Sequence, residues 1–322
     1  MEFFPLDQNW LIEMISLWNK EIGNDFPLRQ ELFYQNSFSD VNVLQNGSFL
    51  AVNENGKLVG FIISKFWQEQ NFDNFHPHTG WIQVLLVDSD YRNCGIGTEL
   101  LTRAENALKE SAVTKILIGS DPWHYFPGVP LEYKATITWL QNRGYEFNTV
   151  ETDLYKIFSD GEDIHLPSIP DIQYTILAER DQNLFIDFLH ENFPGRWEYE
   201  AIQYFKRNGV GREFVIAKKQ GRIIGFCRIN DAKSPFIAQN VYWSPLFSEE
   251  LGGVGPLGIA RSERKNGYGL AIVKAGIYFL RERGIKHMVI DWTGLVDFYG
   301  KLGFKPWKQY MRGVKNFPTE ED

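Results

Sequence analysis

The segment RNCGIG at residues 92–97 and the segment RKNGYG at residues 264–269 share the pattern R-x-x-G-x-G and lie 172 positions apart. Each follows an apolar run and precedes an amphipathic stretch, so each is predicted to join a strand to the start of a helix. Free backbone N–H groups converge at a helix start, and the helix dipole favours negative charge there. Two such turns in the same local context predict a duplicated, phosphate-binding domain.

The length of the chain favours two domains. Its 322 residues exceed one typical domain and suit two of about 150 residues each. The polar segment 159–171, SDGEDIHLPSIPD, contains one Gly and two Pro and is predicted to be a linker. We therefore expect an N-terminal domain at 1–158 and a C-terminal domain at 172–322.

The amino-acid composition of the chain limits the kinds of partner that the protein is expected to bind. The net charge of −8 argues against long-range attraction to nucleic acid or to an anionic membrane. No stretch reaches the ~18 apolar residues of a membrane span, and Met1–Pro5 carries no leader pattern. Two distant cysteines, Cys94 and Cys227, fit a reducing compartment. The expectation is a cytoplasmic protein without nucleic-acid, membrane or metal partners, since no Cys/His cluster has metal-ligand spacing.

Hydrophobic periodicity predicts a similar order of elements in both halves. The expected strands are 48–52, 58–65, 81–87 and 115–119 in the first half, and 214–218, 223–229, 254–259, 287–291 and 307–311 in the second. The expected helices are 10–18, 100–108, 135–143, 185–189, 197–207, 270–280 and 296–301. Strands that alternate with helices predict an α/β fold, in which each tandem domain has a central mixed β-sheet flanked by helices.

A further segment follows each turn. FYGKLGF occurs at 298–304 after the second turn, and WLQNRGY at 139–145 is a weaker match after the first. Strand, turn, helix and this segment together resemble the GCN5-related N-acetyltransferase (GNAT) superfamily in a tandem, two-domain form. The turn followed by FYGKLGF is the specific part of the resemblance, and the two copies cover most of the chain.

The resemblance implies that acetyl-CoA (coenzyme A) binds where two parallel strands part. Its pantetheine arm would pair with the strand before each turn, and its pyrophosphate would accept N–H groups of the turn, where glycine allows close approach and positive φ. In the first copy these positions are Leu86, Val87, Arg92, Asn93, Cys94, Gly95, Ile96, Gly97 and Thr98. In the second copy they are Gly258, Ile259, Arg264, Lys265, Asn266, Gly267, Tyr268, Gly269 and Leu270.

The resemblance also implies an N-acetyltransferase reaction, in which a primary amine of a small molecule attacks the thioester directly. Tyr299 aligns with the tyrosine that often protonates the leaving thiolate in this family, although it also suits a packing role beside Phe298. Asp291 is either the base or amine anchor, or a cap or turn residue at a strand end. Trp292 stands where many members carry Asn, so the base is left open.

The two copies differ at the catalytic position. Leu140 aligns with Tyr299 and has no proton to give, so catalysis is expected in the second domain, with the first a non-catalytic acyl-CoA-binding or structural module. The opposite assignment stays open, because family members without the tyrosine use water as the relay. The 13 extra residues of the first copy fall in the aromatic loop 120–132. This loop either shapes a substrate pocket, with Asp121 and His124 as candidates, or is a buried loop that covers the domain interface. A monomer and a homodimer both remain open.

Overall fold

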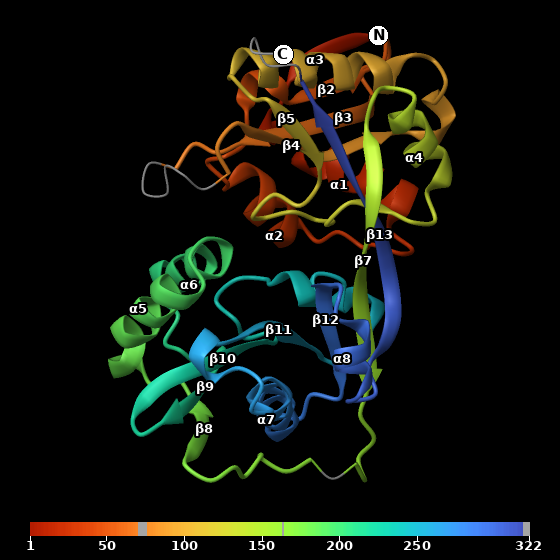
Figure 1. Cartoon of the computed structure of the whole chain (residues 1–322). Coiled ribbons are helices and arrows are strands. Elements are labelled where there is room, and N and C mark those ends of the chain that lie inside the picture. The colour runs from red at the N-terminus through yellow and green to blue at the C-terminus, as the bar shows by residue number, and fades with distance from the viewer. Residues whose placement is uncertain (70–75, 163, 318–322) are drawn as a thin grey trace. The chain divides into compact units, whose positions relative to one another are not determined.

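The computed structural model describes residues 1–69, 76–162 and 164–317 (Figure 1). The chain forms two compact units. The first unit contains Met1–Glu151 together with the described residues from Gln309 onward, and the second contains Thr152–Lys308. Within the described ranges, no helix combines the length and the apolar character needed to cross a membrane.

The first unit is built on a mixed sheet, as the sequence predicts. Its strands, in spatial order, are β1 (Glu2–Pro5), β2 (Phe49–Val52), β3 (Leu58–Phe66), β4 (Thr79–Val87), β5 (Lys115–Ile118) and β13 (Lys305–Asn316). Among the strand pairings given by the described residues of this unit, only that of β4 with β5 is parallel, and the short β6 (Val129–Pro130) pairs with β13. Its α-helices are α1 (Leu11–Ile22), α2 (Gln30–Phe33), α3 (Ile96–Glu110) and α4 (Lys134–Gln141). The apolar face of α3, which includes Leu100, Leu101, Ala104 and Leu108, packs into the core of this unit.

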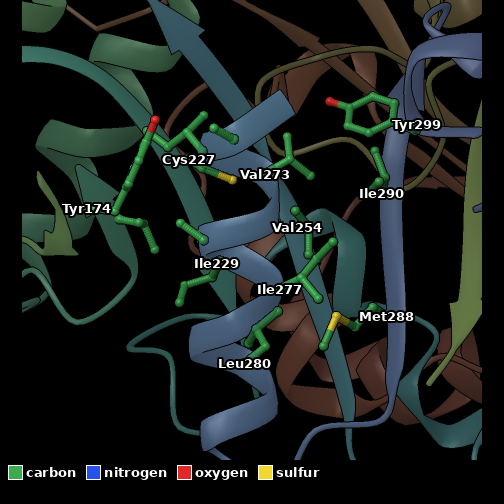
Figure 2. Packing of buried hydrophobic residues seen from close by; sticks show 14 of the residues in the cluster. Tyr174, Cys227, Ile229, Val254, Val273, Ile277, Leu280, Met288, Ile290 and Tyr299 are labelled. Carbon is green, nitrogen blue, oxygen red and sulfur yellow. The ribbon is translucent and has the colours of Figure 1, made fainter. Parts of the chain in front are cut away.

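The second unit repeats this plan. Its strands, in spatial order, are β7 (Glu146–Ile157), β12 (His287–Thr293), β11 (Leu251–Ile259), β10 (Arg222–Asn230), β9 (Phe214–Lys219) and β8 (Ile172–Ile176). In the described part of this unit, the pairing of β11 with β12 is the only parallel one. Its α-helices are α5 (Gln182–Asn192), α6 (Arg196–Lys206), α7 (Tyr268–Glu282) and α8 (Val296–Gly300). Figure 2 shows side chains of α7, β10, β11 and β12 packed together in the core of this unit.

The units divide the chain differently from the predicted domains 1–158 and 172–322. The end of β7, from Thr152, belongs to the second unit, and the end of β13, from Gln309, belongs to the first. There β13 pairs with β5, with Gly313 opposite Ile118, and Lys315 Nζ donates to Glu105 at 2.8 Å. Such pairing joins residues about 200 positions apart, which local periodicity does not encode. The linker at 159–171, whose residue 163 lies outside the described residues, stays a prediction.

Candidate active site

Both Gly-rich turns form open helix N-termini. Helix α3 follows Gly95 with φ of 84°, and α7 follows Gly267 with φ of 79°; neither cap makes a side-chain hydrogen bond. A Cβ at either glycine would meet nothing within 4 Å, so glycine is required here by the left-handed backbone rather than by space. The first N–H groups of each helix lack intrahelical acceptors, and each helix start is therefore able to accept an anion.

The arginine of each turn anchors the preceding strand. Arg92 Nε donates to the carbonyl of Val87, and Arg264 Nε donates to the carbonyl of Ile259, both at 3.1 Å. The guanidinium of Arg92 also forms an ion pair with Glu21. No carboxylate in the described part of the chain lies within ion-pair distance of Arg264. Among the described residues, the positive charge of Arg264 thus has no carboxylate partner, whereas Glu21 neutralises the positive charge of Arg92.

The two turns carry opposite charge. Residues 88–99 have a net charge of −2, from Asp88, Asp90, Glu99 and Arg92. Residues 260–271 have a net charge of +2, from Arg261, Arg264, Lys265 and Glu263. In the first unit the buried Asp88 also binds Lys20 at 2.5 Å and Lys57 at 2.9 Å. Although burial opposes it, these two ammonium groups lower the pKa of Asp88 to about 2. An anion is therefore favoured at the second turn.

The parallel strands part before each turn. In the first unit β4 pairs with β5 only over Thr79–Ile82, and β4 then continues to Val87. In the second unit β11 pairs with β12 only over Leu251–Gly253, and β11 then continues to Ile259. The later residues of β4 and β11 pair with β3 and β10 on their other side. One backbone edge of Leu86–Val87 and of Gly258–Ile259 therefore carries no ladder among the described residues.

The segments 139–145 and 298–304 occupy equivalent places. A Cβ at Gly97 would lie 3.6 Å from Trp139, and a Cβ at Gly269 would lie 3.8 Å from Phe298. The next residue along the chain is Leu140 in the first unit and Tyr299 in the second. Both side chains are buried. The packing thus places a phenol in the second unit where the first unit has an aliphatic side chain.

Tyr299 and Asp291 lie close enough to interact electrostatically. Tyr299 packs in the core beside Ile290, with its hydroxyl pointing toward the N-terminal half of α7 (Figure 2). Burial raises the pKa of Tyr299, and Cys227 and Asp291 add to this effect. The phenol is therefore protonated at neutral pH, as a proton donor must be. Burial also raises the pKa of the Cys227 thiol to about 12, so a thiolate is unstable in this environment.

Asp291 occupies a bulge in β12. Ile290 pairs with Leu154 and Thr293 with Thr152, so one extra residue stands on β12, and Trp292 has φ of 42°. This left-handed conformation is unusual for a bulky residue and re-aims the side chains around it. Burial and the nearby Glu200 raise the pKa of Asp291 to about 6, while Arg196 opposes the rise. A carboxyl with this pKa can take up a proton near neutral pH.

Sequence analysis missed the charged residues that surround Asp291. Glu200 on α6 binds Arg196 Nε at 2.7 Å through one carboxylate oxygen and Arg228 Nη1 at 3.1 Å through the other. Glu200 lies 91 positions before Asp291, so only the tertiary fold brings them together. The sequence did show that Arg196 and Glu200 have the i,i+4 spacing of a charged pair on a helix. Such pairs are common on solvated helix faces, so this spacing does not indicate a site.

The candidates of the first unit lie in a buried ion cluster. Asp121 accepts from Lys65 Nζ at 2.7 Å, and Lys65 also binds Asp40 at 2.8 Å. His124 Nδ1 contacts the backbone carbonyl of Asp121 at 2.9 Å. Lys65 and Asp121 are fully buried. The carboxylate of Asp121 is thus committed to a structural ammonium group.

The aromatic loop 120–132 is packed into the first unit. Tyr125 and Phe126 are buried and contact Trp18, with ring centroids 4.9 Å and 5.6 Å from it. Phe126 also meets Phe26 edge-on at 4.8 Å. Tyr125 and Phe126 are thus part of the interior packing of the first unit.

Both units thus contain parallel strands that part before a Gly-rich helix start. Residues 12–124 and 182–304 match the model of the acetyltransferase (GNAT) family. The chain therefore belongs to this family, and it is an N-acetyltransferase by class. A comparison with curated proteins finds no match to the chain.

Solved structures of tandem acetyltransferases share the whole fold. The chain is similar to the GCN5-related glucosamine N-acetyltransferase region of a fungal multi-domain GH3 β-N-acetylglucosaminidase, with a TM-score of 0.86, 23% identity and 97% of this chain covered. It spans only 38% of the length of that protein. A GCN5-related N-acetyltransferase from Sphaerobacter thermophilus gives a TM-score of 0.69 at 15% identity, covering 98% of this chain and 95% of its own. A tandem GNAT protein from the clavulanic acid biosynthesis pathway gives 0.68 at 15%, with 99% of both chains covered.

Proposed function

We propose that the protein transfers an acetyl group from acetyl-CoA to a primary amine of a small molecule, and that the second unit carries the reaction. The observation behind this assignment is that one unit combines four features. These are a positively charged turn, parted parallel strands, a buried phenol and a carboxyl whose pKa is near 6. The first unit shares the open turn and the parted strands but has neither the positive charge nor the phenol.

The residues of the second turn fit acetyl-CoA. The uncapped start of α7, the guanidinium of Arg264, which has no carboxylate partner among the described residues, and the open space at Gly267 suit a pyrophosphate. The backbone edge of Gly258–Ile259 suits an amide-bearing arm, because it offers donors and acceptors without a strand partner. The proposed binding residues are Gly258, Ile259, Arg264, Lys265, Asn266, Gly267, Tyr268, Gly269 and Leu270.

The chemistry assigned to the chain is proton transfer. Bound acetyl-CoA supplies an acetyl carbon, to which the amine nitrogen forms a C–N bond while the C–S bond breaks and its electron pair leaves on sulfur. Asp291 takes the proton that the amine loses, because its pKa of about 6 leaves it ionised at neutral pH. Tyr299 holds the proton that the sulfur takes.

A second candidate function concerns the first unit. Its turn keeps the left-handed Gly95 and the uncapped start of α3, which favours a retained acyl-CoA site without catalysis. The residues of this site would be Leu86, Val87, Arg92, Asn93, Cys94, Gly95, Ile96, Gly97 and Thr98. Its net negative charge predicts weaker binding than at the second turn.

The test is amine-dependent acetyl transfer. Glucosamine is the first acceptor to use, because the similar fungal region is named as a glucosamine N-acetyltransferase. Release of the CoA thiol and formation of the acetylated amine would be followed together, with a reaction lacking amine as control. We expect both products to rise in a one-to-one ratio. If acetyl-CoA binds but none of a panel of amino sugars, amino acids and polyamines is acetylated, the proposal is wrong.

A further inference from the structure

Strand β10 of the second unit presents two different faces. Cys227 and Ile229 pack with α7 in the apolar core (Figure 2). Because side chains alternate along a strand, Arg228 and Asn230 belong to the opposite face. There Arg228 binds Glu200 on α6. Two polar residues thus stand side by side on the sheet face covered by α6.

Each of these residues has a buried polar atom without a partner. Arg228 is 2% exposed and Asn230 is 1% exposed. Neither Arg228 Nε nor Asn230 Oδ1 has a hydrogen-bond partner among the described residues. More than about 90% of buried polar groups in folded proteins are paired. Two exceptions at positions i and i+2 of one strand therefore indicate a place where a bound group completes the hydrogen bonds.

The neighbouring contacts fix which atoms are left open. Arg228 Nη1 donates to Glu200, and the guanidinium lies 4.8 Å from the Phe236 ring centre. Asn230 Nδ2 donates to Asn240 Oδ1 at 3.0 Å, and Asn240 Nδ2 donates to the carbonyl of Gly255 at 3.2 Å. Rotating the side-chain amide of Asn230 or of Asn240 by about 180° would place two oxygen atoms against each other. The hydrogen bonds therefore fix the orientation of both amides. The open pair is consequently one donor, Nε, and one acceptor, Oδ1.

The open pair also lies near the reacting region. Asn230 is paired with Gly253, which is the last residue of β11 that pairs with β12 before the strands part. The charge of Arg228 acts on Asp291 and lowers its pKa, against the larger effects of burial and Glu200. The charge of Arg228 therefore lies within electrostatic range of Asp291, which is the proposed base for the amine.

A hydroxyl group matches one donor and one acceptor, because it both donates and accepts. A carboxylate or phosphate would be repelled by Asn230 Oδ1, and an ammonium would be repelled by Arg228. We propose that the acceptor is a hydroxylated primary amine, an amino alcohol or amino sugar, whose hydroxyl is bound by Arg228 Nε and Asn230 Oδ1. This inference rests on the proposed acetyl transfer in the second unit.

The test compares two amines that differ by one hydroxyl, 2-aminocyclohexanol and cyclohexylamine. Turnover with acetyl-CoA would be measured for the wild type, Arg228→Lys and Asn230→Leu. Arg228→Lys keeps a positive charge for Glu200 and removes Nε, and Asn230→Leu removes Oδ1 at similar size. We expect the wild type to prefer the amino alcohol by about tenfold or more in kcat/KM, the value of one buried hydrogen bond. Each variant should lose most of this preference, because its kcat/KM for the amino alcohol should fall toward its value for cyclohexylamine.

Arg281→Lys, in the same unit on α7, is the matched control and should keep the preference. Melting temperatures would show whether a variant is folded, and one folded variant of the two is enough for the test. Equal kcat/KM for the two amines in the wild type overturns the inference and leaves the proposed function standing. Calorimetry would measure whether the amino alcohol binds even when it is not acetylated. If no acetylation occurs but binding still depends on Arg228 and Asn230, the hydroxyl site stands and the proposed function fails; if neither is observed, both fail.

Discussion

The first and second turns have nearly the same backbone and opposite charge. Gly95 and Gly267 differ by 5° in φ, and both arginines donate to the strand end at the same distance. The first turn, however, is surrounded by Glu21, Asp88 and Asp90, whereas the second is flanked by Arg261 and Lys265. The difference teaches that the repeated fold preserves where an anion can bind, and that side chains decide how strongly it is favoured.

The same contrast appears where the parallel strands part. Gln83 on β4 corresponds to Gly255 on β11, 172 positions later. In the first unit Gln83 donates to the carbonyls of Asn36 and Trp123 and accepts from Ser37. These buried polar groups satisfy one another. In the second unit Arg228 Nε and Asn230 Oδ1 have no hydrogen-bond partner among the described residues, and the hydroxyl group proposed above would complete their hydrogen bonds.

The largest effect is expected from filling one turn at a time. Gly269→Trp places a ring where the proposed pyrophosphate approaches, and we expect acetyl-CoA turnover to fall by about 100-fold or more. Gly97→Trp makes the same change in the first turn and should leave at least about a tenth of the activity. Calorimetry with acetyl-CoA and turnover would be measured for both, after circular dichroism shows that they fold. The reverse order of effects would assign the reaction to the first unit.

The next effect tests the phenol. Tyr299→Phe removes one hydroxyl, and we expect kcat to fall by about 100-fold, because general acid catalysis typically contributes 10²–10⁴-fold. The KM for acetyl-CoA should stay nearly constant. Tyr174→Phe is the matched control, since Tyr174 is also buried in the second core and its hydroxyl has no partner among the described residues. A Tyr299→Phe enzyme with undiminished kcat would show that the proton comes from elsewhere.

A smaller effect, about tenfold, is expected from pH. With a pKa of about 6, Asp291 is ionised above this value, so kcat/KM should rise through pH 6 and be about tenfold lower at pH 5 than at its plateau. Glu200→Gln removes a negative neighbour and should move this rise to lower pH. The pH profiles of the two proteins would be compared with the same amine. If the midpoint of the pH profile is the same in the variant, the ionisation that controls kcat/KM is not that of Asp291.

The smallest effect concerns stability. The pKa of Asp88 is about 2 in the folded protein against an ordinary 3.8, so its contribution is complete above pH 3.8 and is lost as pH falls toward 2. Asp88→Asn should lower the free energy of unfolding at pH 7 by about 1–2 kcal/mol, a value reduced for the exposed partners Lys20 and Lys57. Denaturant titration at pH 7 and near pH 2 would show the difference shrink. Asp90→Asn, at an exposed carboxylate, should change stability by less than about 0.5 kcal/mol.

Local patterns in the sequence were enough for the fold class and for the two turns. Each strand, turn and helix start is encoded within about twenty consecutive residues, and FYGKLGF pointed directly to the place of Tyr299. The partners of Asp291 could not be found this way. Glu200 and Arg228 reach it through α6 and β10, and their spacing along the chain carries no signal of this contact. The open atoms of Arg228 and Asn230 are likewise a property of the packed sheet.

The contribution of β13 to the first unit has a consequence for synthesis on the ribosome, which proceeds from the amino to the carboxyl end of a chain. The second unit is continuous from Thr152 to Lys308 and can close as soon as that stretch has emerged. The first unit begins earlier but receives its final strand only when residues 309–316 appear. The first unit is therefore completed after the second, and a chain that stopped before residue 309 would lack the last strand of the first unit.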